Sequence, residues 1–184
     1  MNNPLLIVLD MDGTLLDDEK KVHKYTKRLL KKLSDECHYV VLASGRAPFA
    51  IKKYYDDIGL NSPIICYNGS YIFHPYDKSF KVYKFEFDKD IIKQIYLNLG
   101  KKVIKNMICE DVDKIWANYF TQGHKDYLWI DHDHCILGDI DKTLDENPMT
   151  VIFEYNHLSD KDIIRAEVAK YEGMGYRFWP NTQY

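Results

Sequence analysis

Two carboxylates near the start of this 184-residue sequence lie two positions apart, Asp10 and Asp12 in Asp10-Met11-Asp12-Gly13-Thr14. A short apolar run, Leu5 to Leu9, precedes them directly. Two like charges about 4 Å apart repel by ~4 kcal/mol at an effective dielectric of about 20, so an acidic pair at the end of a buried strand needs compensation. A divalent cation would offset the repulsion. The plain alternative is an acidic turn, but so specific a pattern is not expected by chance in this composition.

An acidic pair with Mg²⁺ is suited to the hydrolysis of phosphate monoesters. That reaction is slow in water, so a site for it needs a nucleophile, charge neutralisation and a proton donor for the leaving alcohol. A carboxylate held at a strand end, Asp10, can attack phosphorus and form an aspartyl phosphate. A second carboxylate at a turn that Gly13 frees, Asp12, can protonate the leaving oxygen and later activate water.

The pattern of residues 1–69 predicts a parallel α/β sheet that would position this pair. Short apolar runs over 5–9, 39–43 and 63–67 are typical of buried strands, and helical periodicity over 20–33 and from Pro48 onwards separates them. Alternating strands and helices form right-handed βαβ units, whose ligands sit beyond the carboxyl ends of the strands. Polar residues follow all three ends: Asp10, Asp12, Ser44, Arg46 and Asn68.

The pattern changes after Gly69, where we place a domain boundary. Residues 70–184 predict an α+β unit with strands over 71–74, 80–87, 103–109, 149–155 and 176–179. Asp88 is expected to cap a helix that runs to about Leu99, and Ser159 or Asp160 to open a helix over 158–172. The segment 111–147 has no clear pattern. The expected fold class is α/β, with a partial Rossmann-like core at 1–69 and an α+β domain at 70–184.

Three motifs resemble those of the haloacid-dehalogenase-type (HAD) phosphatases, and within them the Cof-like branch. They are Asp10-Met11-Asp12-Gly13-Thr14-Leu15-Leu16, Ala43-Ser44-Gly45-Arg46 and Cys66-Tyr67-Asn68-Gly69-Ser70, and their order and spacing match along the whole chain. The resemblance implies a Mg²⁺-dependent phosphatase that acts on a small phosphorylated metabolite, such as a sugar phosphate, through an aspartyl phosphate.

The resemblance also implies roles for single residues. Asp10 would be the nucleophile and a Mg²⁺ ligand, and Asp12 the acid/base that also gives the metal its backbone carbonyl. Ser44 matches the phosphate-binding Ser or Thr of the family. The turn Asn68-Gly69 matches the start of a large α+β cap, which would comprise residues 70–184. The residues predicted to bind phosphate or substrate are Ser44, Gly45, Arg46, Asn68 and Gly69.

Several of these residues have a second interpretation. Arg46 can bind either a substrate phosphate or a nearby carboxylate. Asn68-Gly69 is also an ordinary type I′ hairpin sequence. The basic side of the helix over 20–33 is typical of a solvated face. The aromatic residues of the second domain are expected to be core rather than a substrate cage: Trp116, Tyr119, Phe120, Tyr127 and Trp129.

Two elements of the HAD pattern are not found, a lysine that steadies the phosphate and a Gly-Asp-x-x-x-Asp-type motif. Gly138-Asp139-Ile140-Asp141, with Asp145 beyond, falls within the expected cap and is interpreted as a decoy. His132-Asp133-His134-Cys135 lacks the usual spacing of metal ligands. With Asp10 and one backbone oxygen as its protein ligands, Mg²⁺ would bind weakly.

These omissions lead us to expect a piece of a longer phosphatase, or a short form with little activity. A partial core would expose a sheet edge and apolar surface, which could drive self-association. A second hypothesis is a non-catalytic phosphometabolite-binding or partner-dependent remnant. A third, a nucleotide-sugar transferase that holds a metal with Asp-x-Asp, is disfavoured because that motif usually follows a nucleotide-binding half.

Composition excludes other classes. With 25 basic and 28 acidic residues the formal charge is −3, which offers no broad cationic surface to a nucleic acid. No apolar run approaches the ~18 residues of a membrane span. The four cysteines are far apart and are expected to be free, in keeping with a cytoplasmic location.

Overall fold

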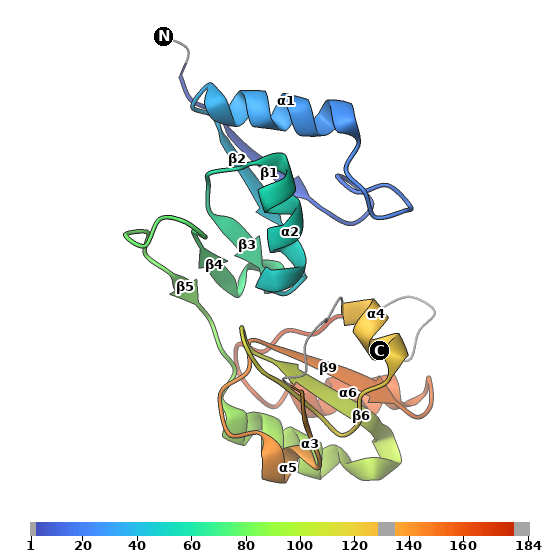
Figure 1. Cartoon of the computed structure of the whole chain (residues 1–184). Coiled ribbons are helices and arrows are strands. Elements are labelled where there is room, and N and C mark those ends of the chain that lie inside the picture. The colour runs from blue at the N-terminus through green and yellow to red at the C-terminus, as the bar shows by residue number, and fades with distance from the viewer. Residues whose placement is uncertain (1–2, 129–134, 179–184) are drawn as a thin grey trace. The chain divides into compact units, whose positions relative to one another are not determined.

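The computed structural model describes residues 3–128 and 135–178, which form two compact units, each with its own sheet (Figure 1). The first unit runs to Phe85 and includes Leu128. The second begins at Glu86 and, among the described residues, comprises the remainder. The start of a cap near Gly69 stays a prediction. The compact units are defined by the contacts within each of them, and they divide between Phe85 and Glu86.

The first unit contains the expected parallel sheet. Its five strands lie in the order β1-β2-β3-β4-β5, and β1 to β3 run parallel. The helices α1 (Lys24–Asp35) and α2 (Pro48–Ile58) contact each other and connect the parallel strands. The strands are β1 (Leu6–Asp10), β2 (Tyr39–Ala43), β3 (Ile64–Cys66), β4 (Tyr71–Phe73) and β5 (Tyr83–Lys84). The α/β fold class and the three parallel strands are confirmed.

Local chemistry sets the ends of the two helices. His23 Nδ1 accepts a hydrogen bond from the Tyr25 N–H, so α1 begins at residue 24 and not at residue 20 as predicted. Pro48 occupies the first turn of α2, where its missing N–H costs nothing. Gly59 ends α2 with a φ of 76°, a left-handed conformation that glycine adopts without steric cost.

The hairpin predicted at Asn68-Gly69 is present between β3 and β4, with Cys66 opposite Tyr71. Its loop is longer than a two-residue type I′ turn, because a 3₁₀ turn spans Tyr67–Gly69. Asn68 has a φ of 55° and Gly69 a φ of 102°, both in the left-handed region. The strand predicted over 80–87 shortens to the two residues of β5.

β1 forms one edge of the first sheet. Within the described chain it pairs with β2 alone. Leu6 and Val8 on this strand are 68% and 49% exposed. The predicted exposed edge is therefore found at the strand that carries Asp10.

The second unit is a four-stranded sheet in the order β8-β7-β6-β9, with α3 and α6 packed together. Asp88 accepts a hydrogen bond from the Asp90 N–H and caps α3, as predicted. The strands are β6 (Ile104–Glu110), β7 (Ile115–Ala117), β8 (Cys135–Leu137) and β9 (Thr150–Tyr155). The helices are α3 (Lys89–Val103), α4 (Gln122–Leu128), α5 (Ile140–Thr143) and α6 (Asp160–Val168).

Trp116 lies at the centre of the core of the second unit, fully buried, which confirms its predicted role. Its indole N–H donates to Asp145 Oδ1 at 2.9 Å, so the ring is buried with its polar atom satisfied. Tyr119 and Phe120 are half-buried. The predictions for the Tyr127 side chain, Trp129 and residues 132–134 lie outside the described residues.

Two sequence predictions for the second unit need correction. Residues 176–178 of the predicted last strand form no strand; Phe178 instead packs edge-on against Tyr155 with 6.2 Å between ring centroids. The predicted opening of a helix at Ser159 or Asp160 is confirmed, since Ser159 is the N-cap residue of α6 and Asp160 its first residue, but the helix ends at Val168 and not near Glu172. No helix in the described part of the chain is both long and apolar enough to cross a bilayer.

Candidate functional site

The predicted site residues gather at the carboxyl ends of the parallel strands in the first unit. Asp10 is the last residue of β1 and lies in register with Ala43, the last residue of β2. Ser44 follows Ala43 directly, and its N–H donates to the Ile65 carbonyl of β3 at 3.0 Å. Because parallel strands end at the same edge, three segments far apart in the sequence meet here.

The turn after β1 presents the carboxylate of Asp10 to solvent. The Leu15 N–H donates to the Asp10 carbonyl at 3.3 Å and the Leu16 N–H to the Met11 carbonyl at 2.9 Å. Gly13 has a φ of 78°, which a residue with a side chain rarely adopts. The hydroxyl of Thr14 donates to Asp10 Oδ2 at 3.2 Å. Asp10 is therefore exposed but oriented by a neighbour within its own motif.

The loops after β2 and β3 are tied together by main-chain hydrogen bonds. The Asn68 N–H donates to the Ser44 carbonyl at 3.0 Å and the Tyr67 N–H to the Arg46 carbonyl at 3.2 Å. The Asn68 side chain lies over Gly45, where an added Cβ would come within 3.0 Å of Asn68 Oδ1. An alanine at position 45 would therefore require the Asn68 amide to move.

Asp12 is held by two cations. Arg46 donates from Nε to Asp12 Oδ2 at 2.7 Å and from Nη2 to Asp12 Oδ1 at 2.6 Å, a bidentate fork. Lys20 Nζ donates to Asp12 Oδ1 at 3.0 Å. The hydrogen bonds from Arg46 lower the pKa of Asp12 more than its partial burial raises it, and Lys20 lowers it further. Two partners were predicted for the Arg46 side chain, a substrate phosphate and a nearby carboxylate. The hydrogen bonds from its Nε and Nη2 go to the carboxylate of Asp12.

The structure brings some predicted residues together and leaves others apart. Arg46 contacts Asp12, and its N–H donates to Ser44 Oγ at 3.2 Å. Among the described residues, no hydrogen bond or ion pair joins Asp10 to Ser44, Arg46 or Asn68.

Sequence reasoning missed three residues of this site: Thr14, Lys20 and Tyr54. Thr14 lies within the motif Asp10-Met11-Asp12-Gly13-Thr14, and its hydroxyl group was the feature that could have indicated a role beside Asp10. Lys20 was placed inside a helix, and Tyr54 fitted the apolar face of α2, so neither had a sequence pattern that marked it.

The donor set fits part of a magnesium site. The Asp10 carboxylate is exposed, and within the described chain the Asp12 carbonyl accepts no main-chain hydrogen bond, so both oxygens are suited to a hard cation. The described residues contain no group of three or more His, Cys, Asp or Glu side chains arranged to hold a metal. The side-chain oxygens of Asp12 are already engaged by Arg46 and Lys20.

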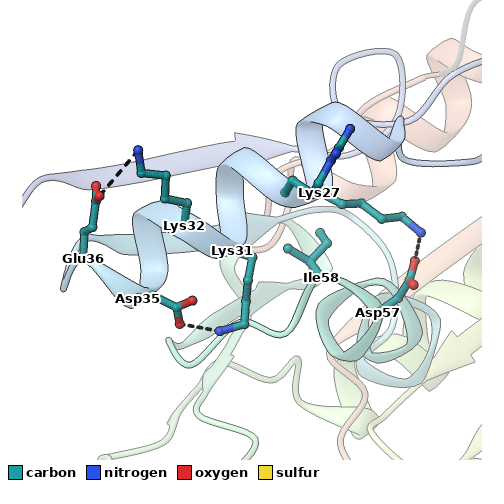
Figure 2. Close-up of a pocket in the computed structure, with 8 residues that line it drawn as sticks. Lys27, Lys31, Lys32, Asp35, Glu36, Asp57 and Ile58 are labelled. Atoms are coloured by element: carbon teal, nitrogen blue, oxygen red, sulfur yellow. Dashed lines mark hydrogen bonds and ion pairs between the residues drawn. The ribbon is translucent and has the colours of Figure 1, made fainter.

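A groove between α1 and the end of α2 carries none of the predicted residues (Figure 2). Lys27 points to Asp57, Lys31 to Asp35, and Lys32 Nζ lies 3.7 Å from Glu36 Oε1. Most basic side chains of this groove therefore form ion pairs with carboxylates of the same groove.

The predicted decoy Gly138-Asp139-Ile140-Asp141 lies in the second unit. Asp139 is the N-cap residue of α5. Its Oδ1 lies 2.9 Å from Lys101 Nζ and its Oδ2 lies 3.2 Å from Lys142 Nζ. Hydrogen bonds from these two lysines lower the pKa of Asp139 to about 2. The described contacts of this aspartate are structural.

Comparison with known proteins decides the family, because residues 7–184 match the model of the haloacid dehalogenase-like hydrolases. The chain belongs to this family. It is 29% identical over 160 residues to the 5-amino-6-(5-phospho-D-ribitylamino)uracil phosphatase YitU of Bacillus subtilis (strain 168), covering 87% of this chain and 58% of that protein. It is 31% identical over 74 residues to the pyridoxal phosphate phosphatase YbhA of Escherichia coli (strain K12), covering 40% of this chain and 27% of that one.

Solved structures of HAD hydrolases share the fold. A crystal structure from Thermotoga maritima superposes with a TM-score of 0.73 at 18% identity, covering 91% of this chain and 62% of that one. A HAD subclass IIB sugar phosphatase superposes with a TM-score of 0.66 at 16% identity, covering 90% and 64%. The chain thus spans about three-fifths of the length of these relatives.

Proposed function

We propose that this HAD-family chain carries the nucleophile half of a phosphatase site for a small phosphorylated metabolite, with residues 70–184 as its cap. The observation that supports the proposal most is the exposed Asp10 carboxylate at the carboxyl end of β1, oriented by Thr14. The phosphatase names of the relatives support the reaction class. A sugar phosphate or a similar ester is the substrate class that we propose.

The reaction proceeds by two displacements at phosphorus. Asp10 Oδ attacks the phosphorus atom, the ester P–O bond breaks, and the leaving oxygen takes a proton from the protonated form of Asp12, which the hydrogen bonds from Arg46 and Lys20 make the minor form. Water then attacks the aspartyl phosphate, gives its proton to Asp12, and releases inorganic phosphate and the Asp10 carboxylate. Ser44, the main-chain N–H groups of Gly45 and Gly69, and the side-chain amide of Asn68 bind the phosphoryl oxygens.

Mg²⁺ would be held by the Asp10 carboxylate and the Asp12 carbonyl. When bound, it supplies charge neutralisation for the phosphoryl group. Mg²⁺ commonly binds through one or two carboxylates plus substrate phosphate and water. Two protein oxygens, from Asp10 and Asp12, are compatible with this coordination.

The test is hydrolysis of p-nitrophenyl phosphate by the 184-residue chain, with Mg²⁺ and after its removal with EDTA. We expect Asp10→Asn to lose the Mg²⁺-dependent rate completely and Asp12→Asn to lose about 10²- to 10⁴-fold. Asp18→Asn is the matched control, because Asp18 is an exposed carboxylate on the same segment outside the site. Equal rates for the wild type and Asp10→Asn would refute the enzymatic proposal.

A second candidate function is a partner-dependent or non-catalytic protein that binds phosphorylated metabolites. The exposed Leu6 and Val8 on the edge strand β1 favour it, since apolar side chains on an open sheet edge commonly pair with another chain. Analytical ultracentrifugation over a range of concentrations tests self-association. Metabolite binding without turnover, together with concentration-dependent assembly, would favour this candidate over catalysis by the isolated chain.

A further inference from the structure

Tyr54 contacts both residues whose cations hold Asp12, the guanidinium of Arg46 and the main chain of Lys20. The side chain comes from α2 and the residue is 8% exposed. Arg46 Cζ lies 5.7 Å from the centroid of its ring. Its hydroxyl donates to the Lys20 carbonyl at 3.0 Å. One side chain thus touches the two residues that Asp12 depends on.

The contact with Lys20 has a conformational reason. Lys20 has a φ of 58°, in the left-handed region that a residue with a side chain rarely adopts. The Lys20 N–H donates to the Asp17 carbonyl at 2.9 Å and so closes a tight turn. The Tyr54 hydroxyl adds a tertiary hydrogen bond to the same residue. That bond helps to fix the turn from which the Lys20 ammonium reaches Asp12.

The contact with Arg46 has an electrostatic reason. A guanidinium stacked near an aromatic ring is attracted to the ring face and loses freedom to rotate. The Arg46 side chain is 5% exposed, so the ring is part of the surface that orients it. The ring centroid also lies 5.0 Å from Lys53 Nζ, so a second cation approaches the same ring. Orientation matters because the fork to Asp12 requires the guanidinium plane to align with the carboxylate.

We propose that Tyr54 is a positioning residue for Asp12, acting through the Arg46 guanidinium and the Lys20 turn. The inference rests on the proposed function, in which Asp12 transfers protons. The Asp12 side chain is 40% exposed and leaves a turn, so without these contacts it would sample several rotamers. A general acid contributes only when its oxygen lies within hydrogen-bonding reach of the leaving group, and a misplacement of about 1 Å can cost ~10²-fold in rate.

The first test requires no activity. Three-bond couplings from the Asp12 carboxyl carbon to the backbone, measured by NMR on the ¹³C,¹⁵N-labelled chain, report the χ1 rotamer. We expect one rotamer in the wild type and averaged couplings in Tyr54→Leu, with Tyr54→Phe between them because it keeps the ring and loses only the hydroxyl.

Tyr55→Phe is the matched control. Tyr55 is the next residue on α2 and is fully buried, and its hydroxyl bonds Ser62 instead of the acidic site. It should lower the stability of the first unit but leave the Asp12 couplings unchanged. If Tyr54→Leu does not fold, as judged by amide spectra, Tyr54→Phe and Lys20→Met carry the same test.

The second test separates positioning from a general structural role. p-Nitrophenolate leaves with little need of a proton, whereas an alkyl phosphate such as propyl phosphate needs one. We expect Tyr54→Leu to reduce kcat on propyl phosphate by about 10- to 100-fold and on p-nitrophenyl phosphate by less than about threefold. Tyr55→Phe should reduce both equally, if at all.

The outcomes distinguish the two proposals. A single Asp12 rotamer in folded Tyr54→Leu or Tyr54→Phe, or an equal loss on both esters, overturns the positioning role. If the wild-type chain hydrolyses neither ester, the proposed catalytic function fails for this chain, and the couplings alone then decide whether Tyr54 positions Asp12.

Discussion

Replacing Glu110 with glutamine should change how the stability of this protein depends on pH. Glu110 is the last residue of β6 and is 4% exposed. It lies opposite Ile115 on β7 and Thr150 on β9. Among the described residues, its carboxyl group makes no hydrogen bond or ion pair. Burial raises the pKa of Glu110 to about 7.

The magnitude follows from linkage. The unfolded chain releases this proton near pH 4.5 and the folded chain near 7, a difference of roughly 2.5 pH units at 1.36 kcal/mol each, or about 3 kcal/mol. Below pH 4.5 Glu110 is protonated in both the folded and the unfolded chain, so its ionisation does not lower the free energy of unfolding. As the pH rises from 4.5 to 7 the unfolded state ionises first, and the free energy of unfolding falls. Glutamine cannot ionise and has almost the same shape.

Urea titrations followed by far-UV circular dichroism at pH 4.5 and pH 8 test this reasoning. At pH 4.5 Glu110→Gln should have nearly the stability of the wild type. At pH 8 it should be more stable by about 3 kcal/mol. Glu172→Gln, at an exposed glutamate, is the control and should match the wild type at both pH values. The reasoning is refuted if the difference between Glu110→Gln and the wild type is the same at the two pH values.

Three further substitutions test the packing and the loops. Asp88→Ala removes the cap of α3 and should lower the free energy of unfolding by about 1 kcal/mol in urea titrations. Trp116→Ala should lower it by about 3–5 kcal/mol, because it empties the centre of the second core. Gly45→Ala should displace the Asn68 amide, seen as a shift of its side-chain NH₂ signals in a ¹⁵N–¹H spectrum; unchanged signals would contradict the 3.0 Å contact.

The sequence predicted that the candidate site residues lie at one edge of the sheet, because that placement depends on topology. Apolar runs identified the three parallel strands, and parallel strands must end at one edge. Asp10, Ser44 and Asn68 therefore had to lie near one another whatever the details of packing. The cap of α3 by Asp88 was predictable for a similar reason, since it depends on neighbours in sequence.

The partners of Asp12 could not be predicted in this way. Arg46 is 34 positions away, and whether its guanidinium turns to a substrate or to Asp12 depends on a rotamer set by packing. Lys20 fitted the periodicity of a helix, but the His23 cap begins α1 later and leaves Lys20 in a turn. Tyr54 shares the apolar spacing of Ile51 and Ile58 on α2, so its hydroxyl gave no sequence pattern.

The elements missed within 111–147 share a different cause. β7 and β8 have three residues each and α5 has four, which is too short for either a two-residue or a 3.6-residue period to repeat. β7 contacts β6 and α5 contacts α3, both of which were predicted, and β8 pairs with β7. The long helices and strands can thus be predicted from their local sequence pattern. The short ones form where they can pack against the long ones, which the local pattern does not indicate.

In the proposed site the metal and the substrate would be coupled. Asp10 and the Asp12 carbonyl would offer Mg²⁺ two oxygens, while Arg46 and Lys20 hold the Asp12 carboxylate. Water and phosphoryl oxygens are the ligands that Mg²⁺ commonly uses beside one or two carboxylates. A phosphoryl group next to Asp10 would then raise the affinity for Mg²⁺, and by reciprocity Mg²⁺ would raise the affinity for the phosphoryl group by the same factor.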